Sequence, residues 1–350
     1  MQRKATALDV AKRAGVSRSA VSLVLNGRGD GNVAKESQDR IRQAALDLNY
    51  SPNPIALSLR NQRTRVIGIV SDEVVVSPFD GNIIGGADDV ARAHGFVTVV
   101  MDTERDASRD ESAVETLLDR QVDGLMYVTV GLKPLDVPQG MLRVPSVLAN
   151  CYDSSDAPRL HHVIPDEVSG GREATEHLLQ LGHRDIAFLA GAATSPAVPL
   201  RIVGHREAMS KAGIPIRKDR VFMAGWDIND GFHGAMGLLS ATERPTAIVC
   251  ANDRLAVGVA LAAARLGLDV PRDLSIMGYD DESRIAATMV PALTTMALPL
   301  REMGAAAMSM LLEQIEDPAK RSTSDGSGHL ETMVPCRLVV RESTGPVPAL

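Results

Sequence analysis

The sequence predicts an α/β protein with an N-terminal helix-turn-helix head and a two-lobed body of doubly wound parallel sheets. The first observation is a pair of short helical patterns, joined by a glycine-containing turn, before residue 27. The second is a regular alternation of apolar, strand-like runs with amphipathic helical segments from residue 66 onward. These units are too many for one compact sheet, which indicates two lobes. The expected boundaries are 1–50 for the head, 51–65 for a hinge, 66–342 for the body and 343–350 for a tail.

The helices of the head are predicted from their caps and their apolar spacing. Thr6 is a suitable N-cap with the acidic Asp9 in the first turn, and Gly15 can adopt the positive φ that ends a helix. Ser17 caps the second helix. Apolar residues recur at helical spacing in the first helix at Leu8, Val10, Ala11 and Ala14. The apolar side of the second helix is Ala20, Val21, Val24 and Leu25, and the inner stripe of the third is Ile41, Ala44, Ala45 and Leu48.

Charge separates the head from the body. Residues 1–65 contain 12 Lys and Arg against 5 Asp and Glu, whereas the remaining residues contain 25 against 39. A basic head attracts phosphates while an acidic body stays away from them. The second helix carries small and hydroxyl-bearing residues that allow it deep into a major groove, where Arg18, Ser19 and Ser22 can reach base edges and phosphates. An ordinary helical hairpin with a solvated charged face is the alternative.

The hinge contains a helix that is too short to be stable alone. Asn53 is a good N-cap and Pro54 a good first residue, but the apolar face spans only about two turns. We expect this segment to fold only when something supports it. Leu59, next to the basic Arg60, suits a wedge that enters a minor groove and unstacks a base step. A flexible tether with an incidental leucine is the alternative.

The body repeats strand and helix in order. The predicted strands are 65–72, 96–103, 122–130, 144–150, 185–191, 246–253 and 274–281, and the predicted helices are 83–95, 112–121, 171–183, 201–213 and 254–267. Polar residues follow several strands, among them Asn150, Asn252 and Asp280. Ligands of such sheets lie beyond the carboxyl ends of the strands. With Trp226 as a stacking platform, these residues favour a polar cleft for a small polyol, although each alone is also a common turn or cap residue.

Other classes of protein fit the sequence less well. It contains none of the glycine-rich phosphate or dinucleotide motifs and no nucleophile elbow, so we expect no enzyme activity, no catalytic residue and no cofactor. The adjacent His161 and His162 cannot both face one metal ion, so we expect no metal site. A periplasmic solute-binding protein would fit the body but not the basic head. No apolar run reaches the ~18 residues that span a bilayer. Three dispersed cysteines and no signal peptide predict a cytoplasmic protein without a membrane partner.

Four segments resemble the lactose-repressor/purine-repressor family of bacterial regulators. They are DVAKRAGVSRSAVSLVLNG (9–27), LNYSPNPIALSLR (48–60), ANDRLAVG (251–258) and SIMGYDD (275–281). The resemblance implies a body similar to periplasmic sugar-binding proteins. It also implies an intercalating role for Leu59, a small minor-groove contact at Ala56, and effector-pocket positions at Arg201, Trp226, Asn252 and Asp280.

We therefore expect a ligand-responsive transcription regulator, a repressor that binds a pseudo-palindromic operator in double-stranded DNA as a homodimer. The expected effector is a small molecule, and the polar residues of the predicted cleft favour a carbohydrate. The predicted DNA-binding residues are Thr6, Ser17, Arg18, Ser19, Ser22, Asn26, Asn53, Ala56, Leu59 and Arg60. The predicted effector-binding residues are Asn150, Arg201, Trp226, Asn252 and Asp280.

Overall fold

The computed structural model forms two compact units, Met1–Arg65 and Val66–Leu350, which are described separately below. The described residues are 5–51, 63–73, 78–157, 159–317, 319 and 331–347. The predicted hinge contacts Asn53, Ala56, Leu59 and Arg60 lie outside these residues. In the part of the chain that is described, no helix is both long enough and apolar enough to cross a membrane.

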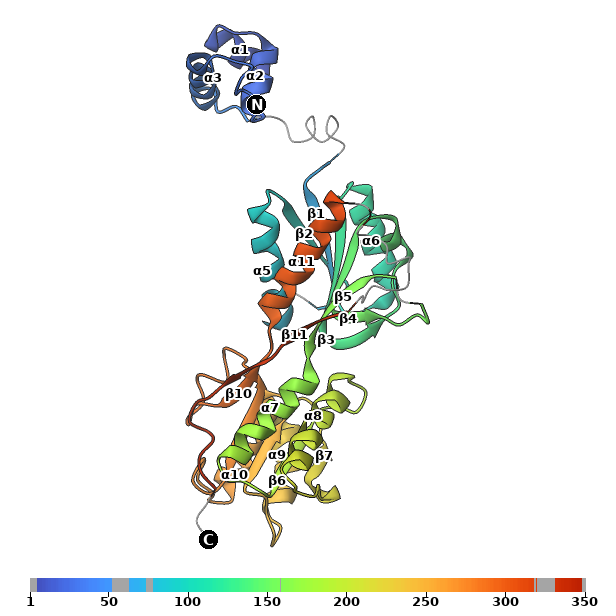
Figure 1. The fold of residues 1–350 in the computed structure, drawn as a ribbon, viewed down its shortest axis with the longest axis vertical. Helices are drawn as coiled ribbons and strands as arrows, with labels where there is room; N and C mark the ends of the chain where they lie inside the picture. The colour runs from blue at the N-terminus through green and yellow to red at the C-terminus, as the bar shows by residue number, and fades with distance from the viewer. Residues whose placement is uncertain are drawn as a thin grey trace. The chain divides into compact units, whose positions relative to one another are not determined.

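The head contains α1 (Ala7–Ala14), α2 (Arg18–Leu25) and α3 (Lys35–Asp47), drawn in blue in Figure 1. The predicted caps are confirmed. Thr6 and Asp9 form a reciprocal capping box, Gly15 ends α1 at φ 67°, and the Ser17 hydroxyl accepts a hydrogen bond from the Ala20 amide at 3.1 Å. Val10, Val21 and Ile41 are buried together in a small core, so each helix contributes one face to it. An ion pair of 2.7 Å between Arg13 and Asp47 joins α1 to α3.

The first lobe of the body, called the N-lobe here, is built on a six-stranded parallel sheet with the order β11-β5-β4-β3-β1-β2. Its strands are β1 (Val66–Ser71), β2 (Val97–Asp102), β3 (Gly124–Leu135), β4 (Ser146–Asp153), β5 (His161–Asp166) and β11 (Glu331–Pro335). Helices α5 (Pro78–Ala93) and α11 (Leu300–Glu316) cover one face, and α6 (Asp110–Asp119) covers the other (Figure 1). The pleat of β1 explains this, because Ile67 and Ile69 point to α5 and α11 while Val70 points to α6.

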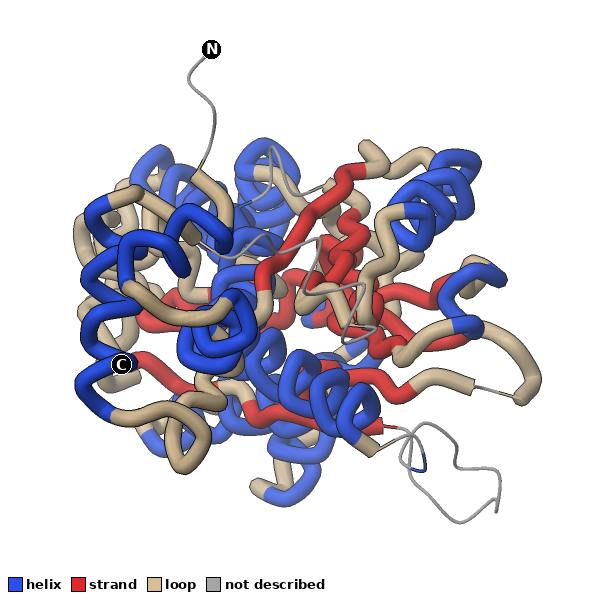
Figure 2. Tube along the Cα trace, turned by 90° about the horizontal axis from the view of Figure 1, so that it is seen from above, coloured by secondary structure: helices blue, strands red, loops and turns tan. Residues whose placement is uncertain are grey.

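The second lobe, called the C-lobe, has the strand order β12-β10-β9-β8-β6-β7. Its strands are β6 (Ile186–Ala190), β7 (Val221–Met223), β8 (Ala247–Cys250), β9 (Ser275–Asp280), β10 (Thr294–Ala297) and β12 (Arg337–Val339). Its helices are α7 (Glu167–Gln180), α8 (Ala197–Lys211), α9 (Ile228–Leu239) and α10 (Asp253–Arg265). Helices flank the strands of the body in Figure 2. The strands of this sheet pair in parallel, as predicted, except that the edge strand β12 runs antiparallel to β10.

The chain passes between the lobes after β5, after β10 and after β11, so each lobe is assembled from separate segments (Figure 1). Segment 343–347 packs against the C-lobe. The Ser343 hydroxyl donates to the Ile276 carbonyl at 2.6 Å, and the Val347 amide donates to the Leu181 carbonyl at 3.0 Å. The predicted boundary at residue 342 is therefore wrong, because these bonds bring the following residues into the body.

Paired glycines bring three pairs of helices into close contact. A Cβ atom on Gly86 of α5 would lie 2.0 Å from the Arg301 carbonyl oxygen of α11, and one on Gly304 of α11 would lie 1.9 Å from the Ile83 carbonyl oxygen. The same reciprocal arrangement occurs at Gly171 and Gly204 between α7 and α8, and at Gly231 and Gly258 between α9 and α10. The backbones of each pair thus touch at a point where no side chain fits.

Candidate DNA-binding head and effector cleft

The second helix of the head presents the predicted DNA contacts to solvent. Helix α2 buries Val21 and Val24 in the head core, which leaves Arg18 and Ser19 exposed and Ser22 half-buried. A guanidinium and two hydroxyls on one short helix provide donors and acceptors for base edges and phosphates. The geometry is thus compatible with α2 as the helix that enters a major groove.

Three other predicted DNA contacts also stabilise the ends of helices. The Thr6 hydroxyl donates to the Asp9 carboxylate at 2.7 Å, and Ser17 caps α2. Asn26 follows α2, and its side-chain amide donates to the Ser22 carbonyl at 2.7 Å. Substitutions at these positions will therefore change helix stability as well as any contact with DNA.

The five predicted effector-binding residues line one cavity between the lobes. This central cavity has a volume of about 550 Å³. It is lined from the N-lobe by Asp72, Arg105, Val130, Gly131, Leu132, Lys133 and Asn150, from the C-lobe by Glu167, Thr194, Ser195, Pro196, Ala197, Arg201, Trp226, Asp227, Asn252, Arg254 and Asp280, and from the crossing after β10 by Leu298 and Leu300. The predicted residues come from β4, α8 and β9 and from the loops after β7 and β8, and the fold brings them together.

Arg201 is held by a partner that the sequence analysis did not identify. Its guanidinium donates two hydrogen bonds to the Glu167 carboxylate, at 2.7 and 2.8 Å, and a third to the Ala251 carbonyl. It also lies 3.6 Å from the centroid of the Tyr279 ring. Burial lowers the pKa of Arg201, but Glu167, Tyr279 and Asp280 together outweigh this and raise it above its ordinary value. Arg201 is therefore a charged anchor between α7, α8 and β9.

Asp280 remains available to a ligand. The residue stands at the end of β9 with φ 109°, a conformation that side-chain-bearing residues rarely adopt. One carboxylate oxygen lies 3.9 Å from a guanidinium nitrogen of Arg201, beyond hydrogen-bond range, and no described residue donates a hydrogen bond to this carboxylate. Burial raises the pKa of Asp280 well above its ordinary value. A buried carboxyl group with unused acceptors favours a ligand that donates hydrogen bonds.

Asn252, Asn150 and Trp226 have structural bonds of their own. The Asn252 side chain accepts from the Leu255 amide at 2.8 Å as the N-cap of α10, and donates to the Trp226 carbonyl at 3.0 Å. The Asn150 amide donates to the Thr129 carbonyl at 2.9 Å. The Trp226 ring packs over Gly191, where a Cβ atom would lie 2.3 Å from it. These residues thus shape the cavity wall and orient the indole that lines it.

Comparisons with known proteins agree with the head and the body. Residues 6–53 match "Bacterial regulatory proteins, lacI family", and residues 175–344 match "Periplasmic binding protein-like domain". The chain is 33% identical to the HTH-type transcriptional regulator DegA of Bacillus subtilis (strain 168), covering 98% of this chain and 99% of that protein. It is 34% identical to the ribose operon repressor of Escherichia coli (strain K12), covering 90% of this chain and 94% of the repressor. The chain belongs to the lacI family.

Solved structures show the same architecture. The lac repressor dimer bound to operator and the anti-inducer ONPF superposes with a TM-score of 0.78 and 28% identity, covering 98% of this chain and all of that one. The complex of the transcriptional regulator CelR with cellobiose gives a TM-score of 0.66 and 27% identity, covering 97% and 99%. The resemblance found in the sequence is confirmed, and this lacI-family member is a ligand-responsive DNA-binding transcription regulator.

Several charged residues that line the central cavity of this lacI-family member were not found by sequence reasoning. Glu167 lies at the crossing from β5 to α7, and Asp72 and Lys133 form an ion pair across the ends of β1 and β3. Arg254, the second residue of α10, forms an ion pair with Glu282 at 3.2 Å. Asp72 gave a signal, since it ends the predicted strand 65–72. The others lie in helices or in a long strand, where the sequence shows no reason for a ligand contact.

Proposed function

We propose that this regulator is a repressor, that it binds a pseudo-palindromic operator in double-stranded DNA as a homodimer, and that a small carbohydrate in the central cavity controls this binding. The observation that carries the effector class is the Asp280 carboxyl group, to which no residue in the described part of the chain donates a hydrogen bond, in a cavity also lined by Trp226. Similarity to a ribose operon repressor and to a regulator solved with cellobiose supports the same class.

A carbohydrate suits this cavity by its chemistry. Sugar hydroxyls can donate to Asp280 and accept from Lys133 or Arg254, which line the same space. The apolar face of a sugar ring can stack on the indole of Trp226. Arg201 contributes mainly by holding Glu167 and the strand end in place, since its guanidinium already makes three hydrogen bonds.

The head supplies the proposed DNA contacts. Arg18, Ser19 and Ser22 project from α2 toward bases and phosphates, with Thr6, Ser17 and Asn26 at the helix ends. For the hinge, the sequence pattern supports minor-groove contacts by Asn53, Ala56, Leu59 and Arg60. A protein with this role acts on chromosomal DNA in the cytoplasm and has no catalytic site. Similarity to a repressor solved as a dimer on its operator supports the homodimer.

A ligand screen tests the effector class. Thermal unfolding of the full chain with single sugars, and with nucleobases as the competing class, will identify ligands by a rise in Tm, because a ligand stabilises the state that binds it. We expect a sugar to raise the Tm and Asp280→Asn to remove most of that rise. A Tm that responds to a nucleobase alone would contradict the carbohydrate proposal.

Genomic fragments test the DNA function. The full chain should retard a specific fragment, and raising the salt concentration should weaken binding. If Arg18 contacts a phosphate, Arg18→Ala should lower affinity and reduce the salt slope by about one. Lys35→Ala, at the exposed start of α3, serves as a control of equal charge change. Equal effects of both variants would contradict the assignment of α2 as the reading helix.

A further inference from the structure

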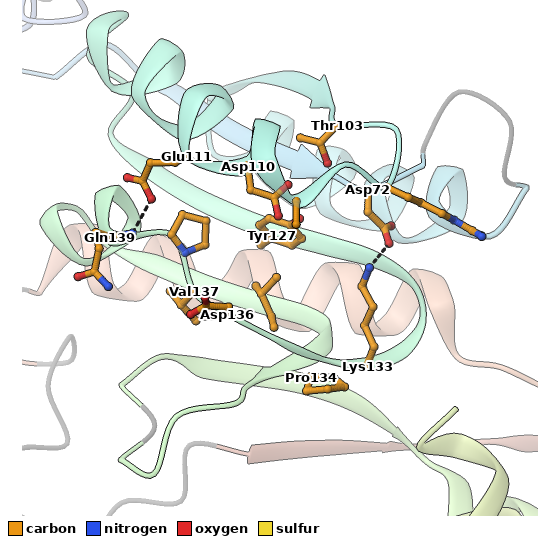
Figure 3. Close-up of a pocket in the computed structure, with 14 residues that line it drawn as sticks. Asp72, Thr103, Asp110, Glu111, Tyr127, Lys133, Pro134, Asp136, Val137 and Gln139 are labelled. Carbon is orange, nitrogen blue, oxygen red and sulfur yellow. Dashed lines mark hydrogen bonds and ion pairs between the residues drawn. The ribbon is translucent and has the colours of Figure 1, made fainter. Parts of the chain in front are cut away.

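The N-lobe contains a second cavity beside the central one. This N-lobe cavity has a volume of about 340 Å³ and lies between the start of α6 and the segment that follows the bulge of β3. Figure 3 shows Asp110 and Tyr127 side by side in it, with Val137 and Pro134 on the opposite wall. Asp72, Arg105 and Lys133 line both cavities, so the two spaces share a wall.

Asp110 is the unexplained group of this cavity. The residue is only 7% exposed, and its Oδ1 atom is buried with no hydrogen-bond partner among the described residues. A buried carboxylate oxygen that receives no donor is costly, since it has lost water and gained nothing in return. The neighbouring Tyr127 is 1% exposed, and burial, followed by the nearby Asp110 charge, raises the pKa of its phenol. Tyr127 therefore stays protonated and neutral.

Two other carboxylates of the lining, Glu111 and Asp72, already have partners. Glu111 accepts hydrogen bonds from the Gln139 amide at 2.9 Å and the Gly140 amide at 3.0 Å. Asp72 accepts from the Val130 amide at 2.8 Å and pairs with Lys133, as the dashed line in Figure 3 shows. Arg105 pairs with Glu73, outside the cavity. The cations of the lining are thus engaged elsewhere, and none of these bonds satisfies Asp110.

The lining as a whole favours a positively charged occupant. It holds the carboxylates of Asp72, Asp110, Glu111 and Asp136 against the cations Arg105 and Lys133. Its remaining wall is mostly aliphatic, formed by Ala107, Pro134, Leu135, Val137 and Pro138. Bare metal ions do not fit, because the described residues contain no group of three or more His, Cys, Asp or Glu that could hold one. An ammonium group on a short aliphatic chain matches both the carboxylate and the apolar wall.

We propose that the N-lobe cavity is a second ligand site, which takes a small aliphatic ammonium compound with its charged group on Asp110. Because the two cavities share a wall, a ligand in the N-lobe cavity can affect effector binding directly. A shift of the Asp72–Lys133 pair changes the shape of both cavities at once. The site does not depend on the identity of the effector in the central cavity.

Calorimetric titration of the full chain with diaminobutane tests this site, with ethanolamine as a shorter ammonium probe and butanediol as the neutral analogue of the diamine. We expect saturable binding of at least one ammonium probe with one site per chain, and no binding of butanediol. Asp110→Asn keeps the shape and removes the charge, so it should weaken binding about tenfold or more. Asp119→Asn, at the exposed far end of α6 and outside the lining of both cavities, is the control of equal charge change and should alter affinity less than about threefold.

The outcomes separate this proposal from its rivals. Failure of both ammonium probes to bind, equal binding by Asp110→Asn, or equal binding of butanediol would overturn it. Binding that is lost in Asp280→Asn but kept in Asp110→Asn would place the ammonium in the central cavity and would also overturn it. If Asp110→Asn does not fold, as judged by circular dichroism, Gln139→Lys takes its place, since it adds a positive charge at the exposed edge of the same lining and should also weaken binding of an ammonium probe.

Discussion

At the residue scale, the buried pair of Glu167 and Arg201 determines how the start of α7 sits against α8. Both side chains are almost fully buried, and the guanidinium forms two of its hydrogen bonds to this carboxylate. Removing one partner of a buried ion pair leaves an uncompensated charge and costs about 3–5 kcal/mol. In Glu167→Gln the amide still accepts one hydrogen bond from Arg201, so the loss should fall below this range. We expect the free energy of unfolding, measured by urea titration, to fall by at least about 2 kcal/mol.

A second pair between the same helices provides the control. Glu176 of α7 pairs with Lys211 of α8 at 3.1 Å, but the Lys211 side chain is largely exposed. Exposed pairs contribute at most about 1 kcal/mol, so Glu176→Gln should have little effect. Equal losses of stability in the two variants would contradict the anchoring role assigned to Glu167.

Asp253 gives the stability of the C-lobe a specific pH dependence. The residue is fully buried and accepts hydrogen bonds from the Thr295 hydroxyl at 2.6 Å and the Glu282 amide at 2.7 Å. Burial raises the pKa of Asp253 to about 7, well above that of an unfolded aspartate. The folded state thus binds this proton more tightly than the unfolded state does. The stability that Asp253 contributes is therefore full below about pH 4 and is lost as the pH rises toward 7.

Comparison with Asp253→Asn isolates this contribution. The free energy of unfolding of the wild type minus that of the variant should fall as the pH rises from 4 to 7, by at most about 1.4 kcal/mol per pH unit. Urea titrations across that range measure the difference, and titrating groups that do not interact with Asp253 cancel in it. A difference that stays constant, or that rises with pH, would show that Asp253 is ionised throughout.

At the element scale, the reciprocal glycines explain why helices of the body pack so closely. Gly258 of α10 faces the backbone of α9, where a Cβ atom would lie 2.2 Å from the Ile228 carbonyl oxygen. Gly258→Ala must push the helices apart and should cost about 1–3 kcal/mol or more, despite the higher helix propensity of alanine. Gly237 of α9 is exposed and has no atom within 4 Å of its Cβ position. Gly237→Ala should therefore stabilise the protein by about 0.5–1 kcal/mol.

Thermal or urea unfolding of the two glycine variants provides the measurement. The prediction requires opposite signs, so a matched gain in both would show that α9 and α10 can separate without loss. A matched loss would show that glycine is needed at position 237 for another reason.

Elements with local signals were predicted well, and elements defined by distant partners were not. Caps such as Thr6 and Ser17 act within one helical turn, so the sequence alone locates α1 and α2. The elements that were not predicted are helices α9 and α11 and strands β5, β7, β10, β11 and β12. Strand β11 is half-exposed, and it becomes a strand only by pairing with β5, far earlier in the chain.

The same limit applies to the candidate site. Asn150, Asn252 and Asp280 were found because they end predicted strands, where ligands of such sheets bind. Glu167 was missed because its role depends on Arg201, which is 34 residues away. The N-lobe cavity was missed for a related reason, since Asp110 is an ordinary first residue of a helix until β3 places Tyr127 beside it.

At the scale of the whole molecule, the proposed repressor must couple its cavity to its head. Thermodynamic linkage makes this coupling reciprocal. If the effector changes the affinity of the protein for operator by some factor, operator changes the affinity of the protein for the effector by the same factor. Such coupling is typically about 1–3 kcal/mol. Two variants separate the sites. Asp280→Asn should weaken the effector with and without DNA, whereas Arg18→Ala should weaken operator binding and leave effector affinity in the absence of DNA unchanged.

Fluorescence anisotropy of a labelled operator, combined with calorimetry of the sugar found in the screen, measures all four affinities. The coupling factor obtained from effector affinities, with and without operator, should equal the factor obtained from operator affinities. Asp280→Asn should need a higher sugar concentration for the same effect on DNA binding, because the lost hydrogen bonds lie in the cavity and the head is unchanged. The proposed coupling would be refuted if Asp280→Asn kept the affinity of the wild type for the sugar and its full effect on operator binding. It would be refuted equally if the sugar bound tightly but left operator affinity unchanged.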